Sequence, residues 1–104
     1  SGVVFLMSNH PKENSKEWIK FVDLCLSAKD RGSLDMILRL FTTMDERDML
    51  ISRYQLVKVL LTTDLSQREI AETLHLSISK VTAGSKATQR LPELQKAYLI
   101  KKMS

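Results

Sequence analysis

The sequence predicts a domain built only of α-helices, and three observations support this. Valine and isoleucine recur at helical spacing and do not alternate as they would in strands. Hairpin dipeptides such as Asn-Gly are absent from the sequence. Residues that cap helix N-termini stand before several apolar stripes. With 104 residues, three glycines and two prolines, we expect one globular domain of six helices over residues 15–104.

The first two helices are predicted in residues 15–42. The first should begin near Ser15 and end around residues 30–32, with Gly32 as a left-handed C-terminal cap. Its apolar stripe consists of Trp18, Phe21, Val22, Cys25 and Ala28. The second should start after Ser33 as its N-cap, with apolar residues on more than one side at Leu34, Met36, Ile37, Leu38, Leu40 and Phe41. Such a helix is buried on more than one side, which favours a partner subunit.

The longest predicted helix covers residues 44–62, roughly 28 Å at about 1.5 Å per residue. Thr43 and Glu46 have the spacing of a capping box at its start. Its stripe consists of Leu50, Ile51, Tyr54, Val57, Leu60 and Leu61. A last helix should begin with Pro92 in its first position. Residues 1–14 are expected to form a flexible N-terminal arm, in which Ser1 and Gly2 look like a cloning remnant and Met7 like a natural start.

The net charge of +4 is confined to the C-terminal part of the chain. Residues 1–65 contain nine basic and nine acidic residues, which cancel. Residues 66–104 contain seven basic and three acidic residues, so the excess is seven minus three, or +4. This asymmetry favours a polyanionic partner for the C-terminal part, with a solvated basic surface as the alternative.

The most informative segment is 66–86, where two capped helices are predicted on either side of a short turn. Ser66 and Glu69 have capping-box spacing before a helix that runs to about Thr73, and Ser77 can cap a helix that runs to about residue 86. His75 stands in the turn, and histidine tolerates a left-handed backbone. The contacts between the helices should come from Ile70, Ala71, Leu74, Leu76, Ile78 and Val81. This pattern is typical of a DNA-binding helix-turn-helix.

The second helix of such a motif presents its N-terminal residues to base edges in a major groove about 12 Å wide. Lys80 can donate to guanine O6 and N7, while Ser79 and Thr82 can contact bases or water. Gln67 and Arg68 begin the first helix and can reach phosphates. The full expected DNA-binding set is Gln67, Arg68, Ser77, Ile78, Ser79, Lys80, Thr82 and Lys86. The alternative is a helical hairpin that only packs or that binds another protein.

No other residue set predicts catalysis or metal binding. His75 has no second ligand at metal-binding spacing, Cys25 lies on an apolar stripe, and glycine-rich phosphate loops and nucleophile elbows are absent. We therefore expect neither an enzyme nor a metal site. A single cysteine excludes a disulfide scaffold and fits a reducing cytoplasm. No apolar run approaches 18 residues, so we expect no membrane partner.

From residue 17 to residue 99 the chain resembles the bacterial tryptophan operon repressor family. The resemblance lies in EWIKFVDL at residues 17–24, DERDMLISRYQLVKVLL at 45–61, and SQREIAETL followed by SISKVTAGS at 66–85. It implies a six-helix chain in an intertwined homodimer that binds an operator with dyad symmetry. It also implies L-tryptophan as a corepressor, bound beside the helix-turn-helix.

The corepressor site implied by the resemblance is only partly present in this sequence. The matching positions are Leu40, Thr42, Thr43, Arg53, Val57 and Gly84. Ala83 stands where the family has a second arginine that stacks on the indole, and Ala87 stands where it has a serine that holds the ammonium group. The amino-acid response is therefore expected to be weakened, altered or absent. A regulator that binds DNA without a ligand is the alternative within the same class.

Overall fold

The computed structural model describes residues 15–104, so the expectations for residues 1–14 lie outside the described part. Six helices succeed one another there, without a strand: α2 (Lys16–Leu26), α3 (Arg31–Phe41), α4 (Met44–Thr62), α5 (Gln67–Leu74), α6 (Ile78–Gln89) and α7 (Glu93–Met103). The all-helical prediction is confirmed. The helices form two compact units, one ending at Thr43 and the other running from Met44 to Ser104. The single-domain organisation remains a prediction.

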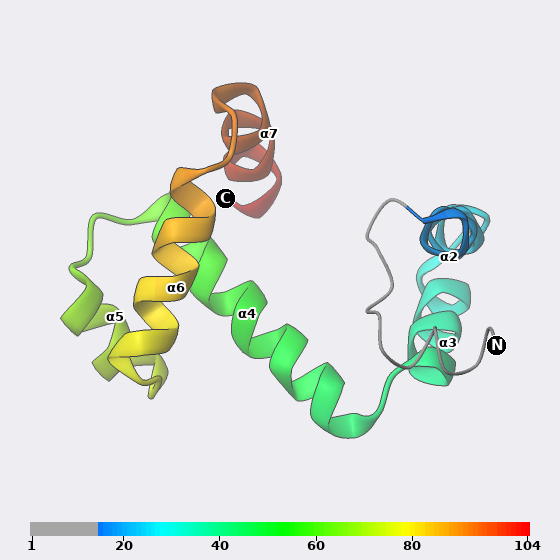
Figure 1. The fold of residues 1–104 in the computed structure, drawn as a ribbon, viewed down its shortest axis with the longest axis horizontal. Coiled ribbons are helices and arrows are strands. Elements are labelled where there is room, and N and C mark those ends of the chain that lie inside the picture. The colour runs from blue at the N-terminus through cyan, green and yellow to red at the C-terminus, as the bar shows by residue number, and fades with distance from the viewer. Residues whose placement is uncertain (1–14) are drawn as a thin grey trace, which may run out of the picture. The chain divides into compact units, whose positions relative to one another are not determined.

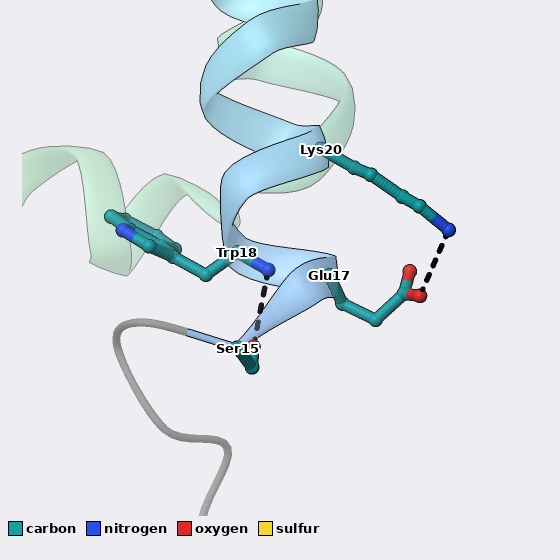
Figure 2. Close-up of polar contacts among 4 residues, drawn as sticks. All are labelled: Ser15, Glu17, Trp18 and Lys20. Atoms are coloured by element: carbon teal, nitrogen blue, oxygen red, sulfur yellow. Dashed lines mark hydrogen bonds and ion pairs between the residues drawn. The ribbon is translucent and has the colours of Figure 1, made fainter.

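The predicted start of the first helix is confirmed by the cap at Ser15. The backbone N–H of Trp18 donates to Ser15 Oγ over 3.2 Å, which satisfies one of the free donors of the first turn (Figure 2). Figure 2 also shows Lys20 Nζ paired with Glu17 Oε1 at 3.3 Å. Both side chains of this pair are largely exposed, so the pair contributes little to stability.

The boundary between α2 and α3 differs from the prediction. Helix α2 ends at Leu26, and α3 has Asp30 as its N-cap, because the Ser33 backbone N–H donates to Asp30 Oδ1 over 2.7 Å. Gly32 and Ser33 therefore lie in the first turn of α3 and cap neither helix. Gly32 has no positive φ angle, as its helical position requires. The prediction failed because Asp30, a strong N-cap whose negative charge suits a helix start, was assigned to the preceding helix.

The first unit packs α2 on α3 through aromatic side chains. The rings of Phe21 and Phe41 meet edge to face with centroids 5.4 Å apart, and Trp18 lies 6.0 Å from Phe21. Among residues 15–43 of this unit, Ile37 is the buried hydrophobic residue. The second apolar side of α3 stays open, since Met36 is 59% and Leu40 is 73% exposed.

Helix α4 occupies the predicted residues 44–62 and is the main support of the second unit. Its buried residue Leu56 forms the core together with Ile70 of α5 and Val81 of α6. Partly buried side chains pack around these three: Val59, Leu60, Ala71, Leu74 and Leu76. In Figure 1, α6 crosses the C-terminal half of α4, and α5 flanks the first turns of α6.

The last two helices begin and end slightly away from the predicted residues. Helix α6 continues three residues beyond position 86, to Gln89. Pro92 is the N-cap of α7 and not its first helical residue; its carbonyl accepts the Lys96 backbone N–H over 3.0 Å. The ψ angle of 148° at Pro92 is extended, which places this residue just before the helix. None of the six described helices has both the length and the apolarity needed to cross a membrane.

Candidate nucleic-acid interface

The start of α5 is fixed by a complete capping box, as predicted. The Glu69 backbone N–H donates to Ser66 Oγ over 3.1 Å, and the Ser66 backbone N–H donates to Glu69 Oε1 over 3.0 Å. The Ser66 backbone N–H, and after it the Ser66 hydroxyl, hold the pKa of the Glu69 carboxyl below its usual value. The first turn of α5 is therefore well ordered at the point where Gln67 and Arg68 project.

The turn between α5 and α6 has the left-handed residue that the sequence predicts. His75 adopts φ 56° and ψ 44°, the one non-glycine positive φ in the described residues. The next residue, Leu76, donates its backbone N–H to Ala71 O over 3.0 Å, as in a Schellman cap. Three residues, 75–77, therefore suffice to connect the two helices.

The packing between α5 and α6 follows the prediction with one exception. Ile70 and Val81 are almost fully buried, and Ala71, Leu74 and Leu76 pack against them. Ile78, however, is 54% exposed and lies outside this core. It is the first residue of α6, and the core lies one turn further along, so its predicted role in fixing the crossing is wrong. Ile78 instead belongs to the exposed surface.

The first turn of α6 uses the two serines for its own structure. Ser77 is the N-cap, and its Oγ accepts the Lys80 backbone N–H over 3.2 Å. Ser79 Oγ lies 3.2 Å from Ser77 Oγ, within hydrogen-bond distance. Ser77 is thus committed mainly to capping, while Ser79 and Lys80 stay exposed on the outer face.

Three exposed basic side chains lie on the α5–α6 pair, together with the exposed acidic residues Glu69 and Glu72 of α5. Arg68, Lys80 and Lys86 are all exposed. None of these three residues has an acidic partner within 4.0 Å in the part of the chain that the structure describes. Their charges are therefore available to an external anion. We call this set of exposed residues, Arg68, Ile78, Ser79, Lys80 and Lys86, the cationic face.

One contact of this region was not predicted from the sequence. Thr82 Oγ1 donates to Gln67 Oε1 over 2.8 Å and lies 2.9 Å from the Ile78 carbonyl oxygen. The bond joins α5 to α6 across 15 positions of sequence. The sequence could indicate this contact only if the crossing of the two helices were already known, because Thr82 and Gln67 are far apart in the chain.

The residues that the resemblance assigns to a corepressor lie in both units. Leu40, Thr42 and Thr43 are at the end of α3 and just after it, and the Thr42 hydroxyl donates to the Leu38 carbonyl. In the second unit, Arg53 is exposed and Val57 half-buried on α4. Their role in ligand binding remains a prediction.

Gly84 has a clear structural role in the second unit. It is buried in α6 against α4, and a Cβ atom there would stand 2.6 Å from Leu56 Cδ2. The glycine therefore allows α6 to approach α4 closely. Ala83 and Ala87, the two departures from the family pattern, are exposed on α6.

A capped helix pair joined by a three-residue turn, with an exposed cationic face, defines a protein of the helix-turn-helix class. Comparison with known proteins narrows the class. The family model described as "Trp repressor protein" matches residues 16–103. The chain belongs to this family, which is one of regulatory proteins and not of enzymes, in agreement with the prediction from the sequence.

Individual relatives named "Trp operon repressor homolog" agree with this assignment. One from Vibrio vulnificus is 36% identical over 93 residues, covering 89% of each chain. One from Histophilus somni is 38% identical over 79 residues, covering 76% of this chain and 74% of the relative. One from Chlamydia trachomatis is 36% identical over 86 residues, covering 83% of this chain and 92% of the relative.

Proposed function

We propose that this protein is a sequence-specific DNA-binding transcriptional repressor that uses α6 to read a major groove. The observation that carries the proposal is the cationic face, which lies on a helix pair whose N-termini are both capped. Arg68, Lys80 and Lys86 have no carboxylate partner among residues 15–104. A phosphate backbone supplies the missing negative charge, and base edges supply acceptors for a lysine ammonium group.

Within this function the exposed residues of the cationic face divide into two roles. Lys80 and Ser79 are in the first turn of α6, where side chains meet base edges, and Lys80 donates to guanine. Ile78 offers an apolar contact for a thymine methyl group. Arg68 at the start of α5 and Lys86 further along α6 bind phosphates and fix the orientation of the protein.

Two copies of the chain are expected to act together as a homodimer on an operator with dyad symmetry. Each unit on its own exposes large apolar side chains: Leu26 and Leu40 in the first are 76% and 73% exposed, and Leu94 in the second is 86% exposed. A second copy would remove such surface from water. Two helix-turn-helix heads would then meet successive major grooves about 34 Å apart.

L-tryptophan or a related amino acid is the proposed effector, with weakened binding. Ala83 removes a cation–π contact worth about 0.5–2 kcal/mol. It also removes a charge-assisted hydrogen bond worth about 1.5–3 kcal/mol. Together these losses weaken tryptophan binding by roughly 30- to several-thousand-fold unless another side chain compensates. Lys80 and Lys86, three residues on either side of Ala83, are the cations on the same helix that could reach the carboxylate.

The exposed alanine at position 83 also favours a second candidate, a repressor that needs no ligand. Calorimetry with millimolar L-tryptophan distinguishes the two candidate repressors, because a measurable heat of binding excludes a repressor that binds no ligand. A gel shift on the same protein with and without tryptophan then shows whether the ligand changes DNA affinity.

The test of DNA binding is selection of duplexes from a random-sequence pool, followed by gel shifts with the enriched sequence. We expect a dyad-symmetric consensus, with affinity that falls with salt by a slope of about −0.9 per phosphate contact. Lys80→Ala should cost about 1–3 kcal/mol if Lys80 reads a base. Lys101→Ala, which removes the same charge from the last turn of α7, is the matched control. Failure to enrich any sequence, with or without tryptophan, would contradict the proposal.

A further inference from the structure

His75 forms the turn between α5 and α6 with a backbone conformation that suits glycine better than histidine. Its φ of 56° and ψ of 44° lie in the left-handed region, where a Cβ atom crowds the backbone and glycine is unstrained. No other non-glycine residue among 15–104 has a positive φ. Backbone strain of this kind gathers at functional positions. We therefore ask what the histidine side chain does that glycine does not.

The imidazole ring of His75 has no partner within the described part of the chain. His75 is exposed, and its ring forms no hydrogen bond or ion pair with any residue from 15 to 104. Its backbone N–H donates to the Ala71 carbonyl, a bond that a glycine would make equally well. The ring is therefore open to a group from outside this part of the chain.

The charged groups on the helices packed around the turn are mainly basic. They are Lys58 on the C-terminal half of α4, Arg68, Glu69 and Glu72 on α5, and Lys80 and Lys86 on α6. Neither glutamate forms an ion pair with His75. Histidine is the side chain that gains a positive charge as the pH falls from about 8 to about 5. A protonated His75 has no carboxylate partner here, and a DNA phosphate would supply the anion.

His75 directly follows the last residue of α5 and stands two residues before Ser77, the N-cap of α6. In a helix-turn-helix the first helix crosses the phosphate backbone, and the first turn of the second meets base edges. The residue that joins them is therefore close to the backbone of DNA bound in this way. We propose that His75 is a DNA-binding residue whose protonated ring binds a backbone phosphate, so that operator affinity rises as the pH falls from 8 to 6. The inference rests on the proposed function and adds a pH-dependent contact to it.

The experiment measures binding of the full chain, at pH 6 and pH 8, to the duplex that the wild-type protein enriches from a random pool. His75→Gly removes the ring and the strain, and His75→Asn tolerates the left-handed backbone but cannot be protonated. At pH 6 both variants should bind about three- to tenfold more weakly than the wild type for each copy on the duplex. At pH 8 the difference should be less than about twofold. His10→Asn, which removes the other histidine of the chain, is the matched control and should respond to pH as the wild type does.

Two further readouts distinguish a phosphate contact from a purely structural effect. Between pH 8 and pH 6 the slope of log affinity against log salt should steepen in the wild type by about 0.9 for each His75 that binds a phosphate. This slope should not change with pH in His75→Gly. The same variant should be at least as stable as the wild type in urea unfolding, so its stability and its DNA affinity should move in opposite directions. With a purely structural role, relief of the strain would leave the affinity unchanged or improved.

Three results would overturn the inference. The first is an equal response to pH in the wild type and in His75→Asn, and the second is loss of the response in His10→Asn. The third is a changed base preference in His75→Asn with an unchanged salt slope, because His75 would then read a base. A wild-type protein that enriches no duplex contradicts the proposed function as well. A duplex that all four proteins bind with the same pH response contradicts this inference alone.

Discussion

Gly84→Ala is the substitution with the clearest expected effect on stability. The added Cβ would lie 2.6 Å from Leu56 Cδ2, 3.2 Å from Leu56 Cγ and 3.4 Å from Leu60 Cδ1. Leu56 is 2% exposed and closely surrounded, so it cannot move away freely. Overpacking of this kind costs about 1–3 kcal/mol. The better helix propensity of alanine returns about 1 kcal/mol, so the expected net loss reaches about 2 kcal/mol.

The matched control is Gly32→Ala in the first turn of α3. There the nearest atom to an added Cβ is Asp30 Oδ1 at 3.5 Å, an ordinary contact. This variant should be neutral or stabilised by at most about 1 kcal/mol. The difference between the two variants therefore isolates the clash at Leu56 from the general effect of replacing a helical glycine.

The assay is urea unfolding followed by circular dichroism at one fixed protein concentration, because association of copies changes apparent stability. A lower midpoint with an unchanged slope indicates a loss of stability. The Leu56→Ala, Gly84→Ala double variant should lose less than the sum of the single losses, since the shortened side chain leaves room for the new methyl group. The close approach of α6 to α4 would be refuted if Gly84→Ala were as stable as Gly32→Ala. It would also be refuted if the stability losses of Leu56→Ala and Gly84→Ala were strictly additive in the double variant.

Three further predictions concern the capping box, the turn and the effector. Glu69→Gln should lower stability at neutral pH. Because the pKa of Glu69 is lowered in the folded protein, its contribution to stability is present above its ordinary pKa and disappears as the pH falls through its pKa in the folded state. The melting curves of the variant and the wild type should therefore converge in acid. A gap that stays constant with pH would contradict this. His75→Val should lose about 1–3 kcal/mol in chemical unfolding, because a β-branched residue is strained at φ 56°, whereas His75→Gly should be at least as stable as the wild type. Ala83→Arg should raise tryptophan affinity by at least about 30-fold in calorimetry if the lost stacking partner is the cause of weak binding; unchanged affinity would point to a different effector.

The sequence predicts local features of this fold well because they depend on neighbouring residues. The caps at Ser66 and Ser77, the left-handed His75 and the helix start near Ser15 are set within a few positions of the chain, and all four were predicted. The predicted boundary between α2 and α3 was wrong because two possible N-caps, Asp30 and Ser33, lie within four residues. Asp30 is the cap, since the Ser33 backbone N–H donates to its side chain over 2.7 Å. Gly32, which has no positive φ, does not cap α2.

The candidate site was predicted in outline but not in its internal connections. Capping spacing sufficed to place Arg68 in the first turn of α5 and Lys80 in the first turn of α6. It could not show that Thr82 bonds to Gln67 or that Gly84 contacts Leu56, because such contacts depend on how closely two helices approach. That distance is set by the packing of the core and not by any local pattern.

The two sides of α6 differ in what they tolerate. Its buried positions recur at helical intervals of three and four, at Val81, Gly84, Ser85 and Thr88, whereas Ser79, Lys80 and Ala83 on the same helix are exposed. Substitutions at the exposed positions leave the interior intact, so single amino-acid changes there can alter the surface of α6 at little cost in folding. The same partition would let an engineer randomise positions 79, 80 and 83 and expect most of the resulting library to fold.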